Sequence, residues 1–126
     1  MLLTEYLSEL VQVIDEYAKT SLIISSEIKN DFRTDQIGII RGNLVFADQS
    51  ILYFTEYLDL RYRTEKLSFS YHYQKKAGTL IFRYDNARHR PKLAFENHKH
   101  LINGKIIAAS VPELTDVLEE VMGHLL

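Results

Sequence analysis

The protein has 126 residues, of which 46% are hydrophobic and 25% are charged. This composition is typical of a soluble globular domain and excludes a disordered or collagen-like chain. The absence of cysteine excludes disulfides, a thiol nucleophile, iron–sulfur clusters and a thiolate zinc site. The net charge of −2 gives no overall basic field, so binding of nucleic acid would need a local basic patch.

The first 24 residues are partly apolar but carry no signal-peptide core. Acidic side chains interrupt their apolar positions, beginning with Glu5 and Glu9, which also excludes a membrane-spanning helix. No internal repeat and no linker rich in Pro, Ser or Gly divides the chain. We therefore predict a single domain over residues 1–126 that resides in the cytoplasm and makes no contact with a membrane.

The N-terminal half begins with a helical pattern and then changes to strand periodicity. Leu7, Leu10 and Ile14 recur at the spacing of an amphipathic helix. From about residue 22 the apolar residues alternate with polar ones, as they do in a β-strand. Four further runs rich in Ile, Val, Phe and Tyr predict strands near 37–46, 50–58, 66–75 and 79–85. Short turn-prone segments separate them, which indicates an antiparallel meander.

The last two of these strands favour a particular pairing. If Ala77 and Gly78 form a two-residue hairpin loop, Tyr73 lies opposite Phe82 and Tyr71 lies opposite Tyr84. His72, Arg83 and Asp85 would then share the solvent face of the sheet. A longer loop would break this register.

The C-terminal segment returns to a helical pattern. Leu114, Val117, Leu118 and Val121 form an apolar stripe after Pro112. An antiparallel sheet with one apolar face must bury that face under another layer, and the apolar stripes of the two helices must pack against such a surface. We therefore predict an α+β domain with an antiparallel β-meander of about five or six strands. The N-terminal and C-terminal helices would pack on one face of this sheet.

The segment from Arg83 to Lys105 is neither clearly helix nor clearly strand. It holds six basic residues against two acidic ones, a local net charge of +4. Basic side chains mixed with aromatic ones and histidines are typical of sites that hold phosphates and stack on bases. RNA or another single-stranded nucleic acid is therefore one interpretation, and an ordinary solvated loop is the other.

Two histidines of this segment flank one residue, in the order His98-Lys99-His100. In an extended backbone both imidazoles point to the same face. They could ligate zinc or another borderline metal, with recruitment of His89 or Asp85. They could instead act as an acid and base pair in phosphodiester chemistry. The spacing alone leaves both alternatives open.

A longer motif in this segment resembles the TumE-type toxins of bacterial toxin–antitoxin pairs. The motif is carried by Arg83-Tyr84-Asp85-Asn86-Ala87, His89, Pro91, Leu93, Phe95 and His98-Lys99-His100. The family usually reads Asn-Ala-Pro-His-His-Pro, whereas this chain has Arg88 before His89 and Arg90 after it. The resemblance covers roughly the C-terminal half. It implies a small cytoplasmic toxin that a cognate antitoxin protein neutralises.

From the residues themselves we infer a ribonuclease that acts without a metal or other cofactor. Arginines can balance the charge of a phosphate, and histidines titrate near neutral pH and can move protons. The predicted catalytic residues are His89, His98, His100, Arg83 and Asp85. The predicted residues for binding RNA as substrate are Arg88, Arg90, Lys99, Tyr84, Tyr73 and His72.

Two other functions and one assembly remain open. A non-catalytic module would bind RNA or an acidic protein partner and leave the RNA intact. A metal-dependent hydrolase built on the histidines would lose its activity to a chelator. The edge strands of the meander could also pair across a two-fold axis and form a homodimer.

Overall fold

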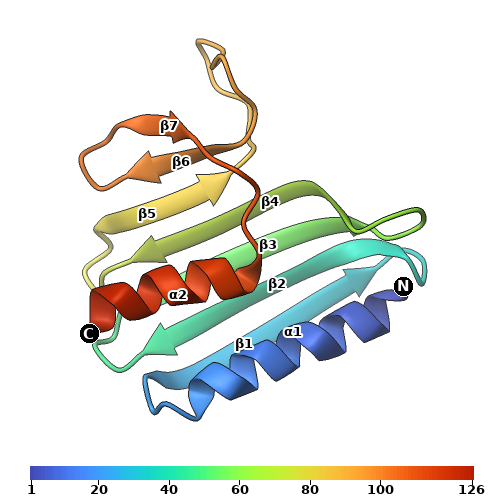
Figure 1. The fold of residues 1–126 in the computed structure, drawn as a ribbon, viewed down its shortest axis with the longest axis horizontal. Helices are drawn as coiled ribbons and strands as arrows, with labels where there is room; N and C mark the ends of the chain where they lie inside the picture. The colour runs from blue at the N-terminus through green and yellow to red at the C-terminus, as the bar shows by residue number, and fades with distance from the viewer.

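The computed structural model describes residues 1–126 and contains two helices and seven strands. Their order along the chain is α1 (Leu3–Ala18), β1 (Ile23–Phe32), β2 (Ile37–Phe46), β3 (Ile51–Asp59), β4 (Glu65–Gln74), β5 (Leu80–Asp85), β6 (His98–Leu101), β7 (Ile106–Ala108) and α2 (Leu114–Leu125). Each strand pairs antiparallel with the next in one sheet (Figure 1). The predicted α+β meander is confirmed, and neither helix is long and apolar enough to cross a membrane.

The sheet has seven strands, more than the five or six predicted. The last hairpin, β6 and β7, lies in the segment that showed no clear periodicity. These strands have only four and three residues, too few to display a hydrophobic alternation. Their turn closes with a hydrogen bond from the Leu101 amide to the Lys105 carbonyl at 2.8 Å, and Gly104 supplies the positive φ of 86° that the turn requires.

Both helices lie on one face of the sheet, as predicted (Figure 1). Val117, Leu118 and Val121 of α2 are fully buried there, in one core with the aromatic side chains of the central strands. The largest of these aromatic residues are Phe46, Phe54, Tyr71, Tyr73 and Phe82. The opposite surface of the sheet carries no helix, and we call it the open face.

The β4–β5 hairpin has the predicted pairs but a different loop. Tyr71 lies opposite Tyr84, and Tyr73 lies opposite Phe82. The loop is longer than two residues, however, because the Lys75 amide bonds to the Thr79 carbonyl at 2.9 Å across Gly78, whose φ is 96°. An irregularity next to Tyr73 and Gln74 takes up the added residue. The prediction that a longer loop would break the aromatic pairing was therefore wrong.

A buried polar network joins α1 to the sheet under this core. The carboxylate of Glu56 is fully buried, and the Lys66 ammonium lies 3.3 Å from it. Tyr6 of α1 donates its hydroxyl to Glu56 at 2.6 Å, and Tyr71 donates to the other carboxylate oxygen. Burial, together with the charge of Glu56, raises the pKa of both hydroxyls, so they remain donors.

Candidate functional site on the open face

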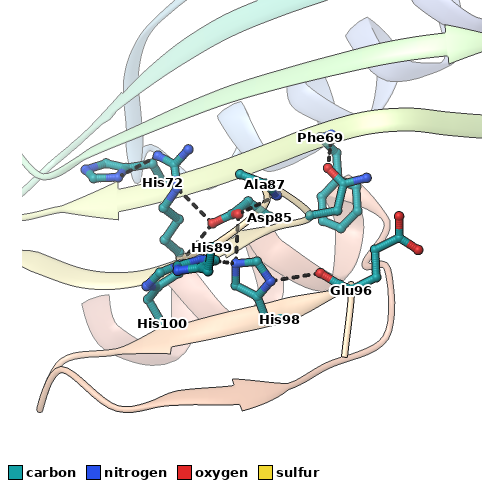
Figure 2. Close-up of polar contacts among 10 residues, drawn as sticks. Phe69, His72, Asp85, Ala87, His89, Glu96, His98 and His100 are labelled. Atoms are coloured by element: carbon teal, nitrogen blue, oxygen red, sulfur yellow. Dashed lines mark hydrogen bonds and ion pairs between the residues drawn. The ribbon is translucent and has the colours of Figure 1, made fainter. Parts of the chain in front are cut away.

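The predicted catalytic residues meet on the open face, on β5, β6 and the loop after β5, near the β7 edge of the sheet. Asp85 pairs with His98, and Arg83 pairs with His100. Since alternate residues of a strand point to the same side, all four side chains face away from the helices. Figure 2 shows His89, from the loop after β5, beside His98 and His100. We call Asp85, His89, His98 and His100 the Asp–His cluster.

The carboxylate of Asp85 is the centre of this cluster. Asp85 is only 2% exposed, and four nitrogen atoms lie close to its two carboxylate oxygens. Oδ1 lies 2.8 Å from His98 Nε2 and accepts the Ala87 amide at 2.9 Å. Oδ2 accepts Arg83 Nε at 3.0 Å and lies 3.1 Å from His100 Nε2. A buried carboxylate with this many partners holds the surrounding rings in fixed orientations.

His98 is the most buried imidazole of the cluster, with none of its side chain exposed. Its Nδ1 lies 2.8 Å from the Glu96 carbonyl oxygen, and its Nε2 lies 3.0 Å from His89 Nε2. A carbonyl and a carboxylate oxygen only accept hydrogen bonds, so bonds to Glu96 and Asp85 together require a proton on each ring nitrogen. The centre of the cluster therefore calls for one positive charge.

His89 and His100 lie on the solvent side of this buried pair. Their ring centroids are 5.3 Å apart, and each ring also lies against His98, at 4.6 and 5.0 Å. About a fifth of the His100 side chain is exposed. Two imidazoles at this separation can reach one small group, such as a phosphate, from two sides.

His100 is held in its neutral form near pH 7. Burial lowers the pKa of its imidazole below 6.5, and the charge of Asp85 opposes this change only in part. The neighbouring His98, His89 and Arg83 lower the same pKa further. A neutral imidazole next to exposed cations can accept a proton from a substrate, so His100 has the properties of a general base.

The same four residues also have the composition of a metal site. One ligand atom from each member of the Asp–His cluster lies within 4.8 Å of the others. The ligands of a tetrahedral zinc ion are closer, about 3.3 Å from one another, for bond lengths near 2.0 Å. A metal would therefore require the widest of these separations to close. The hydrogen bond from His98 to Glu96 would fix that ring for ligation as well.

The residues predicted to bind RNA are divided between the two faces of the sheet. His72 lies beside the cluster, with its Nδ1 3.2 Å from an Arg83 guanidinium nitrogen. Arg88 and Arg90 are exposed in the loop that carries His89. Tyr73, in contrast, is fully buried in the core under the helices.

Tyr84 and Lys99 also face the helices, where both bind Glu120 of α2, at 2.6 and 2.7 Å. Burial is the largest single influence on Lys99 and opposes its charge, but the contacts with Glu120 and Tyr84 together outweigh it and raise the pKa of the ammonium. These two side chains and Tyr73 therefore lie on the far side of the sheet from the Asp–His cluster.

One exposed aromatic residue near the cluster was missed in the sequence. Tyr53 of β3 is 44% exposed on the open face, and its ring centroid lies 6.3 Å from that of His72. The two residues are opposite each other across β3 and β4. Tyr53 lies near His72 only because β3 and β4 pair. The residues next to Tyr53 in the sequence do not indicate this contact.

Comparison with models of protein families shows which family the chain belongs to. The family model described as "Toxin TumE" matches residues 10–125. The chain belongs to the TumE toxin family. The match confirms the resemblance and extends it into the N-terminal half. This TumE-family protein is thus the toxin of a toxin–antitoxin pair, which implies a cognate antitoxin as its partner. No curated protein and no solved structure matches the chain significantly.

Proposed function

We propose that this TumE-family toxin is a ribonuclease that cleaves RNA at the Asp–His cluster without a metal ion. The observation that carries the proposal is the arrangement of His89 and His100, two accessible imidazoles 5.3 Å apart above a buried carboxylate. Acid–base chemistry on a phosphodiester needs two proton carriers on opposite sides of one phosphorus atom. Exposed arginines of the adjacent loop, Arg88 and Arg90, can attract the phosphate.

The proposed reaction begins with His100, which is neutral, as the general base. It takes the proton of a ribose 2′-hydroxyl, and the oxygen attacks the neighbouring phosphorus. The bond from phosphorus to the 5′ oxygen breaks, and His89 gives the proton of its other ring nitrogen to that leaving oxygen while its Nε2 takes the proton of His98 Nε2, which lies 3.0 Å away. The products are a 2′,3′-cyclic phosphate and a 5′-hydroxyl. Arg83, whose side chain is about one-third exposed, would balance the charge that develops on the phosphate oxygens.

Asp85 and His98 act as positioning residues in this scheme. Both are buried, so neither reaches an RNA chain on the surface. The carboxylate of Asp85 orients His100 and Arg83. The ring of His98 supports His89 at 3.0 Å. Such support fixes the reacting groups before the substrate arrives.

A second candidate is a metal-dependent hydrolase that uses the same cluster. It is favoured by the convergence of three imidazoles and one carboxylate within 4.8 Å, a ligand set that suits zinc and related ions. The ion would then supply the positive charge at the centre of the cluster, and it would activate water for attack on the phosphodiester.

The test is cleavage of a 5′-labelled single-stranded RNA by the purified protein, with and without EDTA. We expect cleavage with a 2′,3′-cyclic phosphate end that EDTA leaves unchanged. His100→Gln and His89→Gln should each reduce the rate by about 10²- to 10⁴-fold. His124→Gln is the matched control, because this exposed histidine lies in the last turn of α2.

The other outcomes separate the alternatives. Loss of cleavage in EDTA, with recovery on addition of Zn²⁺, would favour the metal-dependent hydrolase. RNA that is bound but stays intact would favour the non-catalytic module. Full activity of both cluster variants would contradict a reaction at this site.

A further inference from the structure

We propose that the open face between β2 and β6 is a binding track for single-stranded RNA, with Tyr53 as a platform for a base and Arg41 as a phosphate contact. The inference rests on the proposed function for its choice of RNA. It goes further by defining where the strand lies before it enters the Asp–His cluster. Neither residue was a candidate in the sequence.

The pairing of the strands places these side chains in two rows that run across the sheet to the cluster. One row contains, in order, Asn43, Tyr53, His72, Arg83 and His100. The row beside it contains Arg41, Thr55, Ser70, Asp85 and His98. Neighbouring strands are about 4.8 Å apart, so Tyr53 lies roughly 14 Å from His100. A few nucleotides can span that distance along the surface.

This part of the sheet is free to receive a ligand. Both helices cover the opposite face (Figure 1), and 44% of the Tyr53 surface remains exposed. Arg41 is exposed, and its guanidinium forms no ion pair or side-chain hydrogen bond with the rest of the protein. The residues between them and the cluster are small or polar, namely Thr55, Ser70 and His72.

The distribution of charge favours an anion on this face. Near the ends of these strands, Glu27 is paired with Lys29 at 3.2 Å and Asp59 with Arg61 at 2.9 Å. Arg83 is paired with Asp85 at 3.0 Å, so Arg41 is the arginine of the two rows that has no acidic partner. The acidic helix α2 lies on the far side of the sheet.

An exposed aromatic ring next to an exposed guanidinium favours a single strand over a duplex or a protein. Bases that are not stacked in a helix can lie on the ring of Tyr53, while the phosphates meet Arg41. A duplex keeps its base faces covered, and an acidic protein segment would use the arginine without needing the ring. The histidines at the end of the two rows, which we propose to cleave RNA, also favour single-stranded RNA as the ligand.

The test is fluorescence anisotropy with a labelled single-stranded 2′-O-methyl RNA, which lacks the hydroxyl needed for the proposed cleavage. Tyr53→Ala should raise the Kd by roughly 5- to 150-fold, the range for the loss of one stacked base. Tyr53→Phe should keep most of the affinity. Arg41→Ala should weaken binding and reduce the dependence of log K on log salt by about one phosphate contact.

Two matched controls come from the loop between β3 and β4. Tyr62→Ala removes a tyrosine that is 92% exposed away from the rows, and Arg63→Ala removes an exposed arginine next to it. Both should bind the RNA like the wild-type protein. Thermal unfolding of each variant establishes that it is folded, which we expect because Tyr53 and Arg41 contribute little to the core.

The outcomes distinguish this inference from the proposed ribonuclease. Weaker binding of Tyr53→Ala and Arg41→Ala supports the track even if the wild-type protein cleaves no RNA. Unchanged binding of both variants overturns the track, even if RNA is cleaved at the cluster. Failure of the wild-type protein to bind the RNA also overturns it and leaves this face to a protein partner such as the antitoxin.

Discussion

Replacement of Asp85 by asparagine is the most direct test of the geometry at the cluster. The amide has nearly the shape of the carboxylate but offers only one oxygen. Whichever way it turns, its NH₂ group faces either the Ala87 amide or the Arg83 Nε–H, which now bond to Oδ1 and Oδ2 at 2.9 and 3.0 Å. At least one of these donors therefore loses its acceptor.

The expected loss of stability follows from these contacts. A buried donor without a partner costs about 1–3 kcal/mol, and the remaining hydrogen bonds lose about 1 kcal/mol with the negative charge. The free energy of unfolding should fall by about 2–4 kcal/mol. For a chain of this length that corresponds to a decrease in Tm of roughly 8–16 °C.

The assay is thermal unfolding followed by circular dichroism, with Asp35→Asn as the control. Asp35 is exposed and its side chain makes no ion pair, so its replacement should change stability by less than about 0.5 kcal/mol. RNA cleavage by Asp85→Asn should show a lower kcat with little change in KM, as expected of a positioning residue. A Tm equal to that of the control would refute the idea that this carboxylate holds the cluster together.

Three further changes test the core, the buried network and the proposed base. Gly42→Ala would bring a Cβ to 2.4 Å from the ring of Phe54 and should cost about 1–3 kcal/mol in chemical denaturation; an unchanged midpoint would contradict this packing. Lys66→Met removes the cation 3.3 Å from buried Glu56 and should cost about 3–5 kcal/mol, whereas a stable variant would mean that the carboxylate has other support. On the acidic side of its pH profile, the rate of RNA cleavage should fall only below pH 6.5, because the lowered pKa of His100 keeps the imidazole neutral until then, and His100→Gln should abolish this acidic limb. A limb centred above pH 6.5 would exclude His100 as the base.

Much of the fold could be predicted from local patterns. The two helices and the first five strands follow from periodicities of 3.6 and 2 residues, which each segment carries by itself. The pairing of Tyr71 with Tyr84 also followed from the sequence, because aromatic residues match across a hairpin. The short strands β6 and β7 could not be found in this way, since they depend on hydrogen bonds to β5 and to each other.

The histidines of the site were found with Arg83 and Asp85 because they lie close together in the sequence, whereas Tyr53 and Arg41 were not found. Alternation along β6 puts His98 and His100 on one face and Lys99 on the other, where it binds Glu120. This alternation could be predicted from the spacing of His98, Lys99 and His100 in the sequence. It places Lys99 on the opposite face of the sheet from the Asp–His cluster. The burial of Asp85 beneath three imidazoles depended on the return of the loop that carries His89.

The sequence by itself determined the helices, most of the strands, the toxin family and the histidines of the candidate site, because each is encoded in a continuous stretch of residues. Only the tertiary structure decided which face each side chain occupies and which residues become neighbours across the sheet. Tyr53 and His72 are close because β3 and β4 pair, and Glu56 and Lys66 meet because an irregularity at Tyr57 and Leu58 turns Lys66 toward the helices. Such contacts depend on register over the whole sheet, and a single inserted residue exchanges the two faces.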